Sequence, residues 1–200
     1  MVAEPLSRRT DMNRDYEIRS LTDLLVQLDQ GYRPKFLCFW GHQPEKNGSV
    51  GKGCLSQWFS APFTVEGDRF ATAEHFMMAA KARLFGDEEA RAQVLAAPSP
   101  ASAKQIGRSV RNFDEARWKA ECFDIVVRAS VAKFSQNPAM GEFLLRTGER
   151  VLVEASPRDR IWGIGMGAAN PDAEQPRKWR GQNLLGFALM AARAQLRAGQ

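Results

Sequence analysis

The sequence predicts an α+β fold, in which a mainly helical single domain surrounds a small mixed or antiparallel sheet. Helix-forming patterns dominate after residue 72, while extended segments are few and short. Strands and helices do not alternate as they do in a doubly wound parallel sheet. The chain of 200 residues with 44% hydrophobic content is also long enough to bury a core without disulfides or metals.

The first part of the chain is expected to form an N-terminal extension, residues 1–34, attached to a domain of residues 35–200. The beginning of the extension is polar and aperiodic, which indicates loose structure up to Arg19. Ser20 is a suitable N-cap for one short amphipathic helix with a leucine face, and Gly31 ends that helix. The sequence does not indicate what the extension does.

Four short segments are expected to be extended. Phe36–Trp40 is a compact apolar run, which predicts a buried strand. Phe63–Phe70 is predicted to be a hairpin that turns at Glu66–Asp68. Val151–Glu154 is predicted to be a strand, and Ile161–Gly165 a second short extended piece.

The helices are predicted from their caps and stops. Thr72 is a good N-cap, Ala73–Leu84 contains no Gly or Pro, and Gly86 provides a left-handed stop. Two further helices are predicted to begin at Asp87, running to about Ala97, and at Ser99-Pro100. The next two are predicted to run from Asp114 to about Gln136, and from Asn137-Pro138 to a stop at Gly148. A final helix is predicted from about Asn183 to Arg197.

Composition and charge favour a soluble cytoplasmic protein. The net charge of +5 and pI near 9.4 weakly favour anionic partners, and we rank a phosphate-bearing small molecule above a nucleic acid. The three cysteines form no Cys-x-x-Cys pair, which suits a reducing compartment. The first residues lack the apolar run of a signal peptide, and no stretch approaches the ~20 apolar residues that cross a bilayer. We therefore expect no membrane partner.

Two glycine-rich segments have the wrong spacing for known nucleotide-binding loops. Gly48–Gly53 lacks the four residues between glycines, and the Ser or Thr after lysine, that a P-loop requires. Gly163–Gly167 does not have the spacing of a dinucleotide fingerprint, and Asn170-Pro171 follows where a helix should start. Neither segment therefore indicates a nucleotide site.

The cysteines and histidines do not predict a metal site. Cys38, His42 and Cys54 lie near one another in the sequence, but no second pair of ligands accompanies them. Spacing alone leaves open a nucleophile pair of Cys54 and His75, which would meet only in the fold. We expect no metal.

The helix after Thr72 places an acid and an amine on one face. Glu74 and Lys81 are seven residues apart, which is close to two helical turns and roughly 10 Å along the axis. Met77 and Met78 lie between them, and the pattern indicates the wall of a cleft. Glu74 also lies in the first turn, where the helix dipole favours its ionised form. The alternatives are a solvated first-turn acid and a lysine extended over apolar surface.

The segment after Val151–Glu154 is the second candidate. Its strand ends in Glu154, a proline turn leads to Asp159, and Trp162 is followed by Gly163. Loops that leave strands hold functional groups on a rigid scaffold, and a glycine there permits close approach of a ring or ligand. The alternatives are an acid that only closes the strand, an aspartate that bonds its own backbone, and a core tryptophan.

The start of the last helix is a third candidate. The amides of Gly181–Asn183 could receive an anion, although Asn183 is equally a good N-cap. The alternative for Trp58 is a core aromatic residue, and the alternative for His75 is a packing or hydrogen-bonding residue. These alternatives stay open from the residues alone.

A set of motifs in this order resembles the YbiA-like or NADAR family, and the resemblance covers about residues 36–197. Each piece is weak and the ordered set is specific. The motifs are Leu55–Phe59 with Pro62-Phe63, Ala73–His75 with Lys81-Ala82, Ala103–Arg108, Lys133-Phe134, Leu144-Leu145, Thr147-Gly148, Leu152–Pro157, Asp159, Trp162–Gly165 and Trp179–Gly186.

The resemblance implies an N-glycosidase that cleaves the bond between a nitrogen and ribose C1′, without a metal or organic cofactor. One branch of the family acts on early phosphorylated intermediates of riboflavin synthesis and releases ribose 5-phosphate. Another removes ADP-ribose from guanine bases, which makes ADP-ribosylated nucleic acid the alternative partner. A third possibility is a non-catalytic module that binds ADP-ribose or NAD.

Site roles follow from this resemblance as hypotheses. Glu74 and Asp159 are assigned as the catalytic carboxylates, and Lys81 either holds phosphate or attacks C1′ as a neutral amine. The predicted substrate-binding residues, which include stacking surfaces and phosphate or ribose contacts, are Trp58, Phe59, His75, Glu154, Trp162, Gly163, Arg180 and Asn183.

Three positions depart from the family pattern. Gln57 stands where Asn is typical, Ala73 where Ser or Thr often precedes the Glu-His pair, and Gln182 where Lys is common. The last change removes one phosphate contact, for which Arg180 could substitute. The loop at residues 42–53 is also longer than usual, which affects substrate identity more than chemistry.

Overall fold

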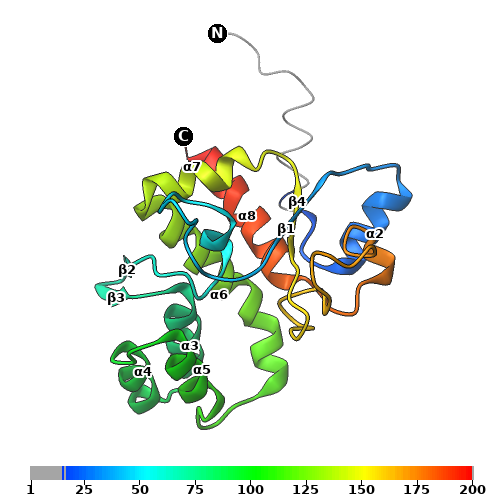
Figure 1. Ribbon diagram of the computed structural model, residues 1–200. Coiled ribbons are helices and arrows are strands. Elements are labelled where there is room, and N and C mark those ends of the chain that lie inside the picture. The colour runs from blue at the N-terminus through cyan, green and yellow to red at the C-terminus, as the bar shows by residue number, and fades with distance from the viewer. Residues whose placement is uncertain (1–14, 16, 200) are drawn as a thin grey trace. The chain divides into compact units, whose positions relative to one another are not determined.

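The computed structural model describes residues 15 and 17–199 (Figure 1). The chain forms two compact units: a first unit of residues 1–41 and 142–200, and a second unit of residues 42–141. The loose structure expected before Ser20 falls mostly outside the described residues. Asp15 and Glu17, which are described, have helical backbone, and Asp15 is buried.

The first unit is built on a parallel pair of strands. β1 (Phe36–Phe39) pairs with β4 (Val151–Glu154), with Phe39 in register with Glu154. The apolar helix α8 (Leu184–Ala198) packs on β4 (Figure 1). Gly186 permits this close approach, because a Cβ there would lie 2.0 Å from the carbonyl oxygen of Leu152. From residue 18 to residue 199, the remaining elements of this unit are α2 (Leu21–Asp29), the end of α7 (Pro138–Arg146) and a short turn, η2 (Pro176–Lys178).

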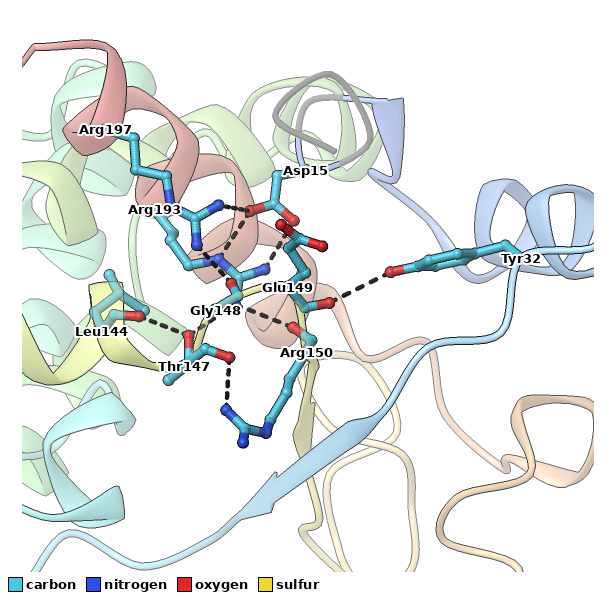
Figure 2. Close-up of polar contacts among 9 residues, drawn as sticks. All are labelled: Asp15, Tyr32, Leu144, Thr147, Gly148, Glu149, Arg150, Arg193 and Arg197. Atoms are coloured by element: carbon cyan, nitrogen blue, oxygen red, sulfur yellow. Dashed lines mark hydrogen bonds and ion pairs between the residues drawn. The ribbon is translucent and has the colours of Figure 1, made fainter. Parts of the chain in front are cut away.

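A buried arginine joins distant parts of the first unit (Figure 2). The guanidinium of Arg193 is fully buried, and it donates to both carboxylate oxygens of Asp15 at 2.7 and 2.8 Å. It also donates to the hydroxyl of Thr147 at 2.7 Å and to the carbonyl of Arg150 at 3.0 Å. The N-terminal segment is therefore tied into the first unit through Asp15.

The second unit is mainly helical. α3 (Ala73–Leu84) contacts α4 (Glu88–Leu95), α5 (Pro100–Arg108) and α6 (Glu115–Gln136). Figure 1 shows α3, α4 and α5 grouped together. The predicted hairpin is present as β2 (Phe63–Val65) and β3 (Asp68–Phe70), which pair antiparallel. A short 3-10 turn, η1 (Lys52–Leu55), precedes the hairpin.

The predicted α+β class is confirmed, and so are the helix starts of the second unit. The side chains of the N-caps Thr72, Asp87, Ser99 and Asp114 each accept a backbone amide of the first turn. The small sheet, however, consists of two separate strand pairs, one parallel and one antiparallel. In the described part of the chain, no helix is long and apolar enough to cross a membrane.

Two local predictions were wrong. Ile161–Gly165 is not extended but forms a series of bends. Asn183 stands at the N-cap position of α8, but its side chain makes no capping bond and its backbone is left-handed, with φ of 57°. The amides at the start of α8 donate instead to backbone carbonyls of the bent loop at residues 160–163. A side-chain cap is therefore not required.

Candidate functional site

The predicted site residues fall in both units. The second unit carries Trp58, Phe59, Glu74, His75 and Lys81. The first unit carries the remainder, which are Glu154, Asp159, Trp162, Gly163, Arg180 and Asn183. The local geometry of each group shows which side chains are available for chemistry and which are used by the fold.

Glu74 is a buried acid at the start of α3. Its residue is only 3% exposed, and its backbone amide donates to the carbonyl of Gln57 at 3.0 Å. Thr72 caps the same turn by accepting the amide of His75 at 3.4 Å. The bond to Gln57 also joins this acid to the segment that bears Trp58.

His75 is held on both sides by the protein. Its Nδ1 lies 2.8 Å from the hydroxyl of Thr72, and its Nε2 lies 3.1 Å from the carbonyl of Ala97. The residue is 2% exposed, so both ring nitrogens are used within the second unit. This is the hydrogen-bonding role that the sequence left open. The pair with Cys54 is also disfavoured, because burial raises the pKa of the Cys54 thiol to about 11.

Lys81 lies in a small enclosure of carbonyl and aromatic groups. Its Nζ donates to the carbonyl of Gly107 at 2.7 Å, and it lies 4.2 Å from the ring centre of Phe113 and 5.6 Å from that of Trp118. Burial lowers the pKa of Lys81. The carbonyl and the ring faces oppose this effect, because both stabilise the ammonium form.

The face of α3 between the acid and the amine packs closely on α5. A Cβ at Gly107 would lie 2.0 Å from the sulfur of Met78, so the methionine occupies the space that this glycine leaves. The predicted sulfur-rich stripe is therefore partly a packing surface. The grouping of Gly107, Phe113 and Trp118 around Lys81 could not be predicted, because these residues come from separate segments of the chain.

Lys133 is a residue near the site that sequence reasoning did not assign. It is 1% exposed, and its Nζ donates to the carbonyls of Cys54 and Ser56 at 2.6 and 2.8 Å. Burial lowers its pKa to about 8, and its Nζ lies 5.9 Å from the ring centre of Phe59. Lys133 thus fixes the segment that carries both aromatic candidates. Its place in the Lys133-Phe134 motif was the available signal.

The two aromatic candidates of the second unit differ in exposure. Phe59 is buried at 8% exposure, whereas Trp58 is half-buried. The Trp58 ring lies 5.7 Å from the ring of His42, and the Nζ of Lys104 lies 5.8 Å from its centre. Trp58 is therefore the better placed of the two to meet a ligand.

Glu154 and Asp159 form an acid-bearing turn at the end of β4. The Oε2 atom of Glu154 is buried and has no hydrogen-bond partner among the described residues. Burial raises the pKa of Glu154 to about 8, and the negative charge of Asp159 adds to this effect. Asp159 Oδ1 accepts the amides of Ile161 and Trp162 at 2.9 and 2.7 Å, which is the local turn considered from the sequence.

Gly163 is required by close approach of the chain to itself. A Cβ at this position would lie 2.8 Å from the carbonyl oxygen of Glu154 and 3.1 Å from that of Asp159. The close approach predicted at this glycine is therefore observed, but the group that approaches is backbone rather than a ligand. Trp162 is half-buried on the same turn.

Asn183 supports β4 rather than an anion. Its Oδ1 accepts the amide of Glu154, and its Nδ2 donates to the carbonyl of Leu152, both at 2.9 Å. The amides of residues 182–185 donate to carbonyls of residues 160–163. Within the predicted anion site at Gly181–Asn183, the bent loop therefore already occupies the amides of Gln182 and Asn183. Arg180 is exposed and is the remaining cation of this segment.

A cavity of about 460 Å³ lies elsewhere in the second unit. Its lining includes Phe76, Ala79 and Arg83 of α3, which face away from Glu74 and Lys81 around the helix. On α6, its lining includes Ile125 and Arg128. Within the described ranges, none of the predicted site residues lines this cavity.

Metal ligands do not converge in the part of the chain that the structure describes. No group of three His, Cys, Asp or Glu side chains there could hold a metal ion.

Comparison with known proteins places these residues in a family context. The NADAR domain matches residues 38–197 of the chain. An N-glycosidase of Acanthamoeba polyphaga mimivirus is 43% identical over 157 residues, which cover 76% of this chain and 92% of that protein. The Riboflavin biosynthesis protein PYRR, chloroplastic, of Zea mays is 35% identical over 139 residues, which cover 65% of this chain and 20% of that protein.

Escherichia coli N-glycosidase YbiA is similar in both sequence and structure. It is 31% identical over 144 residues, which cover 72% of this chain and 81% of YbiA. The NMR structure of the E. coli protein matches with a TM-score of 0.67 and 27% identity, and the match covers 84% of this chain and 88% of that one.

Proposed function

The chain belongs to the NADAR domain family and is an N-glycosidase, and on that premise we propose that it hydrolyses the N-glycosidic bond of a phosphorylated ribosyl compound. The proposed substrate class is that of the early riboflavin-pathway intermediates, and the proposed sugar product is ribose 5-phosphate. The similarity to the riboflavin biosynthesis protein PYRR of Zea mays supports this choice. The net charge of +5 is compatible with a phosphate-bearing substrate.

The observation that carries the proposal is the acid-bearing turn after β4. Glu154, Asp159 and Trp162 come from one short segment, which the bonds of Asp159 to the amides of Ile161 and Trp162 hold in shape. Breaking a ribosyl C–N bond places positive charge on C1′ and the ring oxygen. A carboxylate beside that centre lowers the barrier, because it stabilises charge that appears only in the transition state.

Glu74 and Asp159 are proposed as the catalytic carboxylates. Glu74 is buried in the first turn of α3. Asp159 has a second oxygen, Oδ2, with no protein donor among the described residues. One carboxylate is assigned to stabilise the charge on C1′, and the other to orient or deprotonate the attacking water.

Other residues are proposed to bind or position the substrate. Trp58 and Trp162 are half-buried and are the proposed stacking surfaces for the departing base. Lys81 and Arg180 are the proposed phosphate contacts. His75 and Asn183 are reassigned from substrate contact to positioning, because the polar atoms of their side chains are bonded within the protein.

The test is direct product analysis. The protein is incubated with a pyrimidine-type ribosylamine 5′-phosphate of the early riboflavin pathway, and released ribose 5-phosphate is measured by mass spectrometry. A parallel incubation uses an oligonucleotide with an ADP-ribosylated guanine, and a third uses free ADP-ribose with calorimetry. Release of ribose 5-phosphate from the first compound supports the proposal.

The other outcomes favour the alternatives. Release of ADP-ribose from the oligonucleotide alone, with binding that weakens steeply as salt rises, replaces the proposed substrate with modified nucleic acid. Tight binding of ADP-ribose without any bond cleavage contradicts the proposed hydrolysis. The matched control is Glu142→Gln, a substitution at an exposed position of the first unit, which should leave both folding and product release unchanged.

A further inference from the structure

The carboxyl group of Glu154 is half enclosed by the first unit. Its Oε2 atom is buried without a donor among the described residues, while the residue as a whole remains partly exposed. A carboxylate oxygen buried in this way is costly, because no hydrogen bond replaces its lost water. A neutral carboxylic acid fits the same space better. The residue is not sealed within the unit, because it remains partly exposed.

The backbone around Glu154 is fixed by bonds to two other segments. Its amide donates to Asn183 Oδ1, and its carbonyl accepts the amide of Ile164, both at 2.9 Å. On β1 its register partner is Phe39, which is apolar and 2% exposed. The carboxyl group therefore extends from a rigid strand end rather than from a mobile loop.

The charges near Glu154 also favour the protonated form. The negative charge of Asp159, in the loop after β4, disfavours ionisation of Glu154. Among the described residues, Asp159 is the one charged side chain that shifts the pKa of Glu154. Arg160 and Arg180 each have side-chain atoms against Gly165. On α8, the buried Arg193 bonds the carbonyl of Arg150, which precedes β4 at its opposite end from Glu154. Burial and Asp159 together raise the pKa of Glu154 to about 8.

We infer that Glu154 is the general acid of this enzyme, which gives its proton to the departing base, rather than a substrate contact. This inference rests on the proposed function. A protonated glutamic acid beside a second carboxyl group is the arrangement typical of acid and base pairs in glycosidic hydrolysis.

The step balances with one water molecule. The C1′–N bond breaks with its electron pair moving to nitrogen, and the carboxylic acid of Glu154 protonates the departing base. The oxygen of water bonds to C1′, and the proton that this water loses goes to a carboxylate of the site. Transfer of a proton back to Glu154 restores the acid, so the net reaction consumes only water.

The first test is the pH dependence of kcat for Glu154→Gln and for the control Glu142→Gln, with the pyrimidine-type ribosylamine 5′-phosphate as substrate. Glutamine has the shape of the protonated acid but cannot donate an acidic proton. We expect the wild type and the control to lose activity above about pH 8, and Glu154→Gln to lose about 10²- to 10⁴-fold at pH 7 without that alkaline decline. Near-normal turnover, or an unchanged alkaline decline in Glu154→Gln, overturns the inference.

The second test does not depend on activity. The protein is labelled with ¹³C at the glutamate side-chain carboxyl, and the Glu154 signal is assigned by its loss in Glu154→Gln. We expect its titration midpoint near pH 8 and its acid form to predominate at pH 7. A midpoint near the ordinary value of 4.5 overturns the inference even if the enzyme is active. If the midpoint is high but the wild type cleaves no ribosyl compound, the proposed function fails, and the role of Glu154 as general acid fails with it.

Discussion

Asn183 joins the start of α8 to the end of β4 through two hydrogen bonds to backbone. Its Oδ1 accepts the amide of Glu154, and its Nδ2 donates to the carbonyl of Leu152, each at 2.9 Å. The residue is fully buried and left-handed, a conformation that asparagine tolerates better than most residues. One side chain thus satisfies the backbone of a strand end that carries a proposed catalytic acid.

Replacing Asn183 is therefore expected to destabilise the protein. Asn183→Ala leaves one buried amide and one buried carbonyl without partners, which should lower the free energy of unfolding by about 2–4 kcal/mol. Urea unfolding followed by circular dichroism measures this loss. The neighbouring Gln182→Ala, at an exposed position, is the control and should change stability by less than about 0.5 kcal/mol. Equal stability of Asn183→Ala and the control would show that these two bonds do not matter.

Asp15 is expected to contribute strongly to the stability of the first unit. Asp15→Ala leaves the guanidinium of Arg193 buried without its counter-ion, which should cost about 3–5 kcal/mol. Thermal unfolding measures the change. The exposed pair of Lys119 and Glu115 provides the comparison, because Glu115→Ala breaks a solvated ion pair and should cost less than about 1 kcal/mol. Similar costs for the two variants would contradict the role assigned to Asp15.

The titration of Glu154 predicts a pH dependence of stability. Because folding raises the pKa of Glu154 from 4.5 to about 8, the folded state binds more protons than the unfolded state between these values. The free energy of unfolding should therefore fall as pH rises through this range. Glu154→Gln should remove the decline, so the variant gains stability relative to wild type as pH rises from 4.5 to about 8. Parallel stability curves for the two proteins would exclude a raised pKa.

Lys81 is expected to act as a cation rather than as a nucleophile. Its Nζ donates to the carbonyl of Gly107 and lies 4.2 Å from the ring centre of Phe113, and both contacts stabilise the ammonium. Lys81→Arg should retain at least about ten times the turnover of Lys81→Met, because arginine keeps the charge. Borohydride added during turnover should trap no sugar adduct on the protein. A trapped adduct at Lys81, detected by peptide mass spectrometry, would establish the nucleophilic role instead.

The sequence was most informative where structure is local. Thr72 and Gly86 define α3 through bonds within a few residues of themselves, and both ends of that helix were predicted correctly. The same holds for α6, where Asp114 and Asn137 mark the ends. The ordered set of NADAR motifs also identified the family, which no single segment could have done.

The site details depended on contacts between distant segments and could not be predicted. Asn183 was expected to cap its own helix, but its partners are 29 and 31 residues away. Lys133 bonds carbonyls 77 and 79 residues away, and nothing in its local pattern identifies them. The raised pKa of Glu154 likewise depends on burial, which a strand-ending glutamate does not reveal from its neighbours alone.

The central claim is that Glu74 and Asp159 are the catalytic carboxylates of an N-glycosidase. The most direct measurement is the kcat of Glu74→Gln and Asp159→Asn for release of ribose 5-phosphate, with unfolding curves on the same preparations. Each variant should lose at least about 100-fold in kcat while it remains folded, because each loses a charge that acts in the transition state. Folded variants that both turn over at near wild-type rates would contradict the account.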